Sequence, residues 1–243
     1  MTEVLGLIMA RGGSKSVPRK NIKLLAGEPL ITYTVKEAKK SKHITRLVLS
    51  TDDEEIARVC KRYGAEVPFM RPDELAQDHV TDLPVLQHAL KWLAENQNYR
   101  PELIVHLRPT APFRTAEHID RGVQMLLDDP KADAVRSVCP ASQHPLKMWA
   151  VQPDGALSAY VPEHVFGIVE AYNMPRQKLP KAFVQNGSVD VVRTGVVLEQ
   201  NSMTGRNIKA LLMEELESIN IDSPLDWQLA ELLMQMRNDA LKK

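Results

Sequence analysis

The chain has 243 residues, of which 44% are hydrophobic and 26% charged, a composition typical of a globular protein with a substantial core. Its 31 Lys and Arg residues balance its 31 Asp and Glu residues, so no overall charge favours nucleic acid or an anionic membrane surface. Cys60 and Cys139 have the spacing of neither a disulfide framework nor a zinc site. Because the sequence shows no apolar run of membrane-spanning length and no signal-peptide pattern, we expect a cytoplasmic protein.

Short β-rich runs alternate with amphipathic stretches through the first half of the chain. In chain order, the pattern predicts a strand at 4–9, a helix at 30–40, a strand at 46–50, helices at 54–63 and 83–95, a strand at 103–107, a helix around 119–127 and a strand at 134–138. This alternation is typical of a parallel sheet covered by helices, with ligands bound at the carboxyl ends of the strands.

The composition changes after the strand at 134–138. Between residues 140 and 180 the chain is rich in proline and has no long helical pattern, so we interpret 140–187 as an insertion within a single domain spanning 1–243. The regular pattern then returns, with predicted strands at 188–193, 208–213 and 218–221. A terminal helix is expected from Ser223 and Pro224, with Asp226 placed to complete a capping box.

The stretch ARGGSKSVPRKN, residues 10–21, directly follows the first predicted strand. Gly12 and Gly13 allow a tight turn whose N–H groups can approach a phosphate, while Arg11, Lys15 and Lys20 supply charge-assisted hydrogen bonds. The common nucleotide-loop patterns GxxxxGK[ST] and GxGxxG are absent. A solvated basic turn is the alternative interpretation, but the clustered cations favour an anion-binding loop.

Further motifs follow in order: GEPLITYTVKEA, LVLSTDDEEIARV, VPFMRPDELAQD, LRPTAPFR, PRQKLP, NGSV and INIDSPLDW. With these motifs, the chain resembles the acylneuraminate cytidylyltransferases, the CMP-sialic acid synthetase-like family, over essentially its whole length. The resemblance implies an α/β fold of the nucleotide-diphospho-sugar transferase type. Its parts are a Rossmann-like, mostly parallel sheet with helices on both faces and a small inserted subdomain for dimerisation and substrate contact.

The resemblance also implies an activity and partners. CMP from CTP is expected to be joined to the anomeric hydroxyl of a nonulosonic acid of sialic, legionaminic or pseudaminic type, or of a related 2-keto-3-deoxy sugar acid, with release of pyrophosphate. The expected partners are CTP, the sugar acid and a second copy of the chain in a homodimer, with neither nucleic acid nor membrane.

By the same resemblance, the nucleotide site is expected to contain Arg11, Gly12, Gly13, Ser14, Lys20, Asn21 and Arg71. Lys20 is the cation expected to stabilise the transferring phosphoryl group, and Arg11 and Asp222 complete the predicted catalytic set. Arg71 precedes a proline, which favours an extended backbone and allows its side chain to project into a cleft. A surface turn is the alternative for this position.

The residues expected to bind the sugar acid are Arg108, Thr110, Lys147, Arg176, Asn186 and Asp190. Two of them depart from the family pattern, which usually has glutamine in place of Arg108 and tyrosine in place of Asp190. Arg108 is expected either to clamp the sugar carboxylate or to indicate a different acceptor. For Asp190, the hypothesis is a pair with an amino or hydroxyl substituent of the sugar.

Triphosphate chemistry favours Mg²⁺, with Mn²⁺ as a second candidate. The family has two aspartates separated by one residue near its last strand, and this chain has Asn220 and Asp222 there. On a strand, these alternate side chains face the same side, so both are candidate metal ligands. A cap at the strand end next to Pro224 is the alternative for Asp222.

Two other functions stay open. Arg108 and Asp190 are also consistent with a nucleotidyltransferase that uses another nucleotide or another sugar acid. Asn220, a neutral side chain where the family has a carboxylate, is also consistent with a nucleotide-sugar binding protein without catalytic activity. The intact cationic loop favours an enzyme.

Overall fold

The computed structural model describes residues 2–240 and divides into two compact units. We call Met1–Val138 with Asn186–Lys243 the core unit and Cys139–Gln185 the insert unit. The insertion expected from the sequence at 140–187 covers nearly the same residues as the insert unit. No helix in the described part of the chain is both long and apolar enough to cross a membrane.

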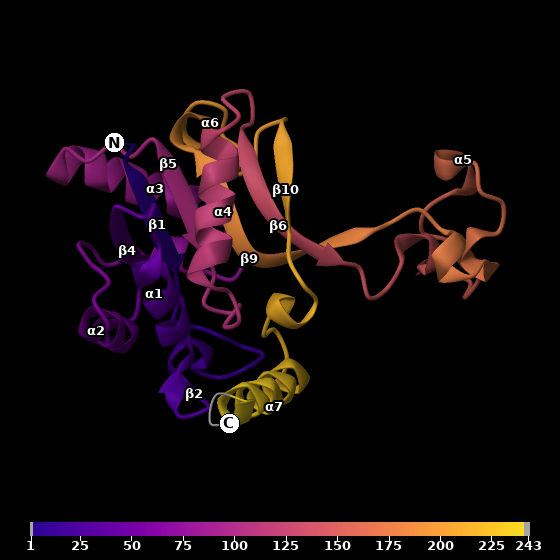
Figure 1. The fold of residues 1–243 in the computed structure, drawn as a ribbon, viewed down its shortest axis with the longest axis horizontal. Coiled ribbons are helices and arrows are strands. Elements are labelled where there is room, and N and C mark those ends of the chain that lie inside the picture. The colour runs from indigo at the N-terminus through magenta and orange to yellow at the C-terminus, as the bar shows by residue number, and fades with distance from the viewer. Residues whose placement is uncertain (1, 241–243) are drawn as a thin grey trace. The chain divides into compact units, whose positions relative to one another are not determined.

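A six-stranded sheet lies at the centre of the core unit, with strand order β10–β6–β9–β5–β1–β4 (Figure 1). Its strands are β1 (Val4–Met9), β4 (Arg46–Ser50), β5 (Leu103–Leu107), β6 (Ala134–Pro140), β9 (Phe183–Arg193) and β10 (Ile208–Leu212). β1 pairs in parallel with β4 and β5, and β10 pairs in parallel with β6. β9 runs antiparallel to β5 and places Asp190 opposite His106. The sheet is mostly parallel, as predicted.

Helices cover both faces of this sheet, as expected for the predicted fold class. The helices of the core unit are α1 (Leu30–Lys40), α2 (Glu54–Arg62), α3 (Asp82–Gln97), α4 (Ala116–Leu127), α6 (Thr194–Leu198) and α7 (Pro224–Ala240). Val4 and Ile8 of β1 pack in one hydrophobic cluster with α1, α2 and α4, whereas Leu5 and Leu7 pack in another with α3 and α6. The alternation of side chains along a strand explains why β1 is apolar throughout.

Two predicted helix starts are confirmed. The Asp53 carboxylate accepts hydrogen bonds from the N–H groups of Glu55 and Ile56 at the start of α2. At the start of α7, the Asp226 N–H donates to Ser223 Oγ at 3.2 Å, and the Ser223 N–H donates to Asp226 Oδ2 at 2.7 Å. This reciprocal pair is the predicted capping box, and it fixes where the chain turns into α7.

α7 packs against the segment that follows β1. Trp227 and Ala230 of this helix form a hydrophobic cluster with Val17, Leu25 and Ile221. In Figure 1, α7 lies beside β2 (Leu24–Leu25), which pairs with β3 (Glu28–Pro29). The C-terminal helix therefore holds two distant segments together: the loop after β1 and the segment that precedes the helix.

The predicted strand at 218–221 is wrong. Leu216–Ser218 forms a 3-10 helix, and the residues between it and α7 belong to no strand. The Ile221 N–H donates to the Thr110 carbonyl at 2.9 Å, and the Ile221 side chain is fully buried in the cluster under α7. The alternation of apolar residues here reflects burial under a helix rather than pairing in a sheet. Asn220 and Asp222 nevertheless line the same pocket.

The insert unit contains a hairpin and short helical turns. β7 (Trp149–Val151) pairs antiparallel with β8 (Leu157–Ala159), and α5 spans Glu163–Phe166. Six 3-10 helices, three of them in the core unit and three in the insert unit, complete the described elements: Lys20–Ile22, Asp73–Leu75, Leu216–Ser218, Pro145–Lys147, Ala171–Asn173 and Arg176–Lys178. Several large apolar side chains of the insert unit are exposed, namely Trp149, Val151, Leu157, Tyr160, Val165, Phe166 and Val169.

Candidate functional site

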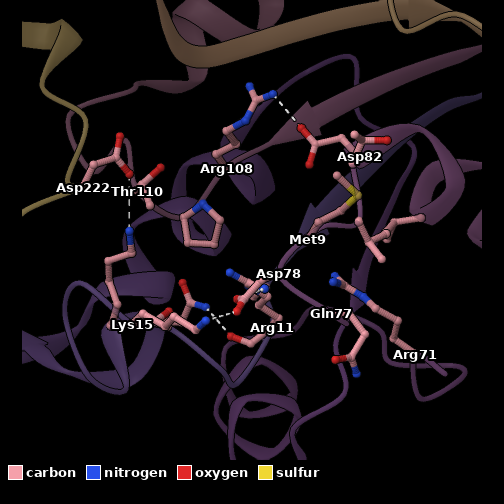
Figure 2. A pocket seen from close by; sticks show the side chains of 18 of the residues that line it. Met9, Arg11, Lys15, Arg71, Gln77, Asp78, Asp82, Arg108, Thr110 and Asp222 are labelled. Atoms are coloured by element: carbon pink, nitrogen blue, oxygen red, sulfur yellow. Dashed lines mark hydrogen bonds and ion pairs between the residues drawn. The ribbon is translucent and has the colours of Figure 1, made fainter. Parts of the chain in front are cut away.

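A pocket of about 600 Å³ lies in the core unit at the carboxyl ends of β1 and β5 (Figure 2). Its charged lining consists of five basic and three acidic side chains: Arg11, Lys15, Lys20, Arg71 and Arg108, with Asp78, Asp82 and Asp222. Ser14, Asn21, Thr110 and Asn220 also line it. The excess of basic groups makes this pocket attractive to an anion, at the edge of the sheet where the sequence places the ligand.

Lys20 is held at the edge of this pocket by the segment that precedes α7. Its Nζ donates to the Ile221 carbonyl at 2.7 Å and lies 3.4 Å from Asp222 Oδ1. The Lys20 side chain is only 11% exposed, so its charge sits in a fixed place with little water around it. Asn21 supports the turn, because its amide donates to the Arg11 carbonyl at 3.0 Å.

Arg11 and Lys15 both contact the carboxylate of Asp78. Arg11 Nη1 lies 2.7 Å from Asp78 Oδ1, and Lys15 Nζ pairs with the other oxygen of Asp78 (Figure 2). The hydrogen bonds from Lys15 and Arg11 hold the pKa of Asp78 below its ordinary value. An anionic side chain thus lies between the two cations that the sequence assigns to a triphosphate.

The two glycines of the loop do not line the main pocket. The Gly12 N–H donates to Asp52 Oδ1 at 3.0 Å, and a Cβ at Gly12 would lie 2.7 Å from Asp53 Oδ2. Gly12 therefore permits a close approach to the capping residue of α2. Gly13 lines a smaller neighbouring pocket. Contact of these N–H groups with phosphate stays a prediction.

Arg71 is fixed at the end of β4. Its Nε donates to Ser50 Oγ at 3.1 Å, its Nη2 donates to the Ser50 carbonyl at 2.6 Å, and its backbone N–H donates to the Thr51 carbonyl. Burial lowers the pKa of Arg71. A buried, hydrogen-bonded guanidinium that lines the pocket fits the predicted place in the nucleotide site better than a surface turn.

Arg108 lies between two carboxylates after β5. Its Nη2 donates to Asp82 Oδ2 at 2.8 Å, and its Nη1 donates to Asp190 Oδ2 at 2.7 Å. Burial disfavours the charged guanidinium, but Asp190 and Asp82 outweigh this effect and raise the pKa of Arg108. The second oxygen of Asp190 lies 3.2 Å from Arg136 Nε. Asp190 does not line the pocket, so the structure places it behind Arg108.

His106 lies next to this group on β5. The side chain is 1% exposed, and its Nδ1 lies 4.0 Å from Asp82 Oδ2 and 4.0 Å from Asp190 Oδ2. These distances exceed a hydrogen bond, and Nδ1 has no hydrogen-bond partner within the described residues. Burial lowers the pKa of His106 to about 4, so the imidazole is neutral near pH 7. His106 lines the pocket, and its buried Nδ1 is a neutral polar atom without a partner.

Arg114 and Asn186 hold the surrounding backbone. Arg114 donates to the carbonyls of Ser188 at 2.6 Å and Arg108 at 3.2 Å, and burial lowers its pKa to about 9. Asn186 accepts from Ser137 Oγ at 2.6 Å and donates to Ser218 Oγ at 2.8 Å. Asn186 is buried outside the pocket lining, so contact with the sugar is a prediction that these bonds do not support.

Lys147 and Arg176 lie in the insert unit. Lys147 Nζ donates to the carbonyls of Tyr172 at 2.9 Å and Met174 at 2.6 Å. The Arg176 guanidinium donates to the Ser142 carbonyl at 3.1 Å and to the Ala141 carbonyl. Both cations therefore close loops within the insert unit, and their contact with a sugar acid stays a prediction.

Asn220 and Asp222 supply the oxygen atoms at one side of the pocket. Asn220 Oδ1 is buried and has no hydrogen-bond partner within residues 2–240, while its Nδ2 donates to Asp222 Oδ2. The described residues contain no cluster of three or more His, Cys, Asp or Glu side chains suited to a metal ion. One carboxylate and one amide oxygen suit a Mg²⁺ ion that takes its remaining ligands from phosphate and water.

Residues 5–200 match the family described as cytidylyltransferase. The chain belongs to this family. It is 35% identical to CMP-N,N'-diacetyllegionaminic acid synthase of Legionella pneumophila, over 98% of this chain and 99% of that protein. It is 32% identical to the synthase of the same name in Campylobacter jejuni, over 98% and 97% of the two chains. The resemblance drawn from the motifs is confirmed.

Solved structures show the same fold. CMP:2-keto-3-deoxy-manno-octonic acid synthetase complexed with CTP aligns with a TM-score of 0.71 at 17% identity, over 97% of this chain and 100% of that chain. The 4-diphosphocytidyl-2C-methyl-D-erythritol synthase of Anaerococcus prevotii aligns with a TM-score of 0.63 at 15% identity, over 96% and 99%. The predicted nucleotide-diphospho-sugar transferase fold is confirmed.

Three titratable residues that line the pocket were not among the predicted site residues: Asp78, Asp82 and His106. Asp78 ends the RPDELAQD motif, which we used only for Arg71. Asp82 precedes an apolar helical pattern and is explained by a favourable interaction with the start of α3. His106 interrupts an otherwise apolar strand, and this interruption was the signal that could have placed it in a polar site.

Proposed function

We propose that this member of the cytidylyltransferase family transfers CMP from CTP to the anomeric hydroxyl of a nonulosonic acid of the legionaminic, pseudaminic or sialic type. The observation that carries the proposal is the buried Lys20 at the edge of a pocket with an excess of basic side chains. The names of the relatives at 35% and 32% identity support the nonulosonic acid as acceptor.

The reaction is an in-line displacement at the α-phosphorus. The sugar's anomeric oxygen forms a bond to that phosphorus and passes its proton to solvent water, while the bond from phosphorus to the bridging oxygen breaks and pyrophosphate leaves with the electron pair. Lys20 stabilises the charge that develops on the transferring group, and Arg11 and Lys15 bind the triphosphate. Arg71 orients the nucleotide from the end of β4.

Asp222 and Asn220 would hold a divalent cation together with the CTP phosphates, and we propose Mg²⁺ with Mn²⁺ as a substitute. The ion would supply further neutralisation of the phosphate charge. Within the chain, Asp222 keeps Lys20 oriented through their 3.4 Å contact, and the Asn220 amide holds the Asp222 carboxylate. These contacts support the assignment of both oxygen donors to the cation.

We further propose a homodimer that uses the insert unit. Its exposed apolar side chains include Val151 and Val169, each 73% exposed, and Tyr160 at 68%. So many large apolar groups on a unit of this size are typical of a surface that another chain covers. Light scattering at micromolar concentration tests this, and a monomer would contradict it.

The activity is tested by pyrophosphate release from CTP with a panel of nonulosonic acids. Replacing Lys20 with methionine keeps much of the volume of the side chain but removes its charge, and should lower kcat by about a hundredfold. Lys61→Met, at an exposed position of α2, is the matched control. Near-normal turnover by Lys20→Met with an unchanged melting temperature would contradict the assigned role.

The same assay separates the alternative functions. The choice of nucleotide is tested by replacing CTP with UTP, GTP or ATP. Turnover with only one of these three would mean that this nucleotide, and not CTP, is the substrate. CTP binding without turnover for every sugar acid, with either Mg²⁺ or Mn²⁺ present, would indicate a binding protein instead of an enzyme.

A further inference from the structure

Arg19 points away from the pocket that its neighbours line. Of the four basic side chains in the loop at 10–21, all of which the structure describes, only that of Arg19 lies outside the lining of the main pocket. Its Nη1 pairs with Asp53 Oδ2, and its Nη2 lies 2.5 Å from Glu55 Oε2. Arg19 therefore ties the loop after β1 to the start of α2, and its charge is already matched by two carboxylates.

The backbone of Arg19 is in the left-handed region, with φ at 55° and ψ at 28°. A residue with a Cβ adopts this conformation at a cost in free energy, which glycine avoids and asparagine reduces. Because such a conformation persists only when the surroundings enforce it, the contacts of the Arg19 side chain gain importance. Its partner Asp53 is itself fixed, since Asp53 Oδ1 accepts from the N–H groups of Glu55 and Ile56. The ion pairs therefore join the strained turn to a rigid helix start.

This turn lies between two anchored residues of the loop. Val17 is 3% exposed in the cluster with α7, and Lys20 Nζ donates to the Ile221 carbonyl at 2.7 Å. The Lys20 N–H donates to the Val17 carbonyl at 3.1 Å, and the Arg19 carbonyl accepts from the Ile22 N–H at 3.0 Å. The conformation of Arg19 therefore sets the direction in which the Lys20 side chain leaves the backbone.

We propose that Arg19 is a positioning residue for Lys20, because its ion pairs with α2 hold the left-handed turn that directs the Lys20 side chain into the pocket. This inference rests on the proposed function of Lys20. In the competing role, Arg19 leaves Asp53 and Glu55 and binds a phosphate of CTP directly. The two roles predict different results for the same variants.

Arg19→Ala and Arg19→Asn are compared by pyrophosphate release from CTP with the nonulosonic acid that wild-type enzyme uses best. Both variants lack the charge, but asparagine tolerates the left-handed conformation better than alanine. Arg19→Ala should lower kcat about tenfold and change KM for CTP by less than about twofold, and Arg19→Asn should recover part of the loss. Arg62→Ala, exposed on α2, is the matched control. An equal rise in KM for CTP in both Arg19 variants, without a loss of kcat, would identify a phosphate ligand and overturn the inference.

The direction of the effect of Glu55→Gln separates the two roles again. Weakening the anchor of Arg19 should lower kcat about twofold, the scale of an exposed ion pair. If Glu55 instead competed with phosphate for Arg19, its neutralisation would lower KM for CTP at unchanged kcat, and the inference would be overturned. Glu54→Gln controls for the lost charge, because Glu54 is exposed in the same turn and makes no ion pair within residues 2–240.

The position of Lys20 is also measured without catalysis. Reductive methylation followed by tandem mass spectrometry of a chymotryptic digest gives the extent of modification at Lys20, whose side chain is 11% exposed. Arg19→Ala should raise this modification several-fold at an unchanged melting temperature, and Arg62→Ala should not. Equal modification of Lys20 in wild-type protein and Arg19→Ala would overturn the inference. If wild-type enzyme used no sugar acid, the proposed function would fail, and the modification of Lys20 would still decide whether Arg19 positions it.

Discussion

Arg108 and Asp190 are expected to act as one unit in the stability of the fold. Arg108→Gln leaves the Asp190 carboxylate, 4% exposed, without its 2.7 Å partner. Breaking such a buried pair costs roughly 3 kcal/mol, less what Arg136 recovers from its 3.2 Å contact with Asp190. Asp190→Asn should destabilise the protein for the reciprocal reason.

A double-mutant cycle by urea unfolding checks this coupling. The double variant Arg108→Gln with Asp190→Asn removes both charges, so neither is left without its partner. Its loss of unfolding free energy should therefore be smaller than the sum of the two single losses, by about 1 kcal/mol or more. Additive losses would show that the two residues contribute to stability independently.

Asn220 offers a test of the metal ligands. Asn220→Asp gives the pocket a second carboxylate beside Asp222, and a cation site with two carboxylates binds a hard divalent ion more tightly. The Mn²⁺ dissociation constant, measured by calorimetry with a nonhydrolysable CTP analogue, should fall several-fold. The extra charge also lies close to Lys20, which contacts Asp222 at 3.4 Å, so unchanged Mn²⁺ affinity would indicate that the carboxylates serve Lys20 instead.

Among single residues, the sequence was sufficient to predict those whose chemistry is common to any triphosphate site. Arg11, Lys20 and Arg71 were predicted, and the structure brings them into one pocket. The carboxylates that contact Arg11 and Arg108 were not predictable, because Asp78 and Asp82 lie in segments where an acidic residue has an adequate local explanation. Asp190 was singled out, but its partner Arg108 is 82 positions away, and no local pattern specifies such a pairing.

At the level of elements, Asp78 joins two segments: it lies after the 3-10 helix Asp73–Leu75 and contacts the loop that follows β1. Arg11 and Lys15 both contact this carboxylate, which competes with phosphate for the same two cations. Asp78→Asn removes the competing charge. We expect KM for CTP to fall about threefold at low ionic strength, the scale of an exposed ion pair, and the effect to shrink in high salt.

The contrary outcome for Asp78 has a distinct meaning. If KM for CTP rose in Asp78→Asn, the carboxylate would be holding Arg11 and Lys15 in place for the nucleotide rather than competing with it. Asp128→Asn, exposed and outside the pocket, controls for the loss of one negative charge.

α7 is expected to support the site through Trp227. This side chain is 3% exposed and packs with Ile221, whose carbonyl accepts a hydrogen bond from Lys20 Nζ at 2.7 Å. Trp227→Ala should lower the unfolding free energy by about 3–5 kcal/mol and also reduce kcat, because the acceptor of Lys20 loses its support. Urea unfolding and pyrophosphate release measure the two effects. A loss of stability without any change in kcat would show that α7 does not support the position of Lys20.

Elements with a strong local signal were predictable, and those defined by distant packing were not. α1 and β1 have the predicted bounds, because each carries a complete helical or strand pattern. The segment at 218–221 shows the opposite case, since Ile221 is buried and Ile219 partly buried in the cluster with α7. The antiparallel direction of β9 depends on the path of the chain through the insert unit, which no strand pattern encodes.

For the molecule as a whole, the burial of His106 predicts an acid-sensitive fold. Burial lowers the pKa of this side chain to about 4 in the folded protein, against 6.5 for an ordinary histidine. Between these values the unfolded chain binds a proton that the folded protein does not, so stability falls as the pH falls from about 6.5 to about 4. The difference in pKa corresponds to about 3 kcal/mol.

The histidine contribution is isolated by comparing wild-type protein with His106→Gln. The glutamine does not titrate, so the free energy of unfolding of the variant should decline less between pH 7 and pH 4.5, and the two curves should approach each other as the pH falls. Carboxylates with lowered pKa values, such as that of Asp53, lose their contribution in both proteins and mainly at lower pH. Urea unfolding at intervals of half a pH unit gives the curves. Parallel curves would mean that His106 binds a proton with the same pKa in the folded and the unfolded protein, which would place water at its Nδ1.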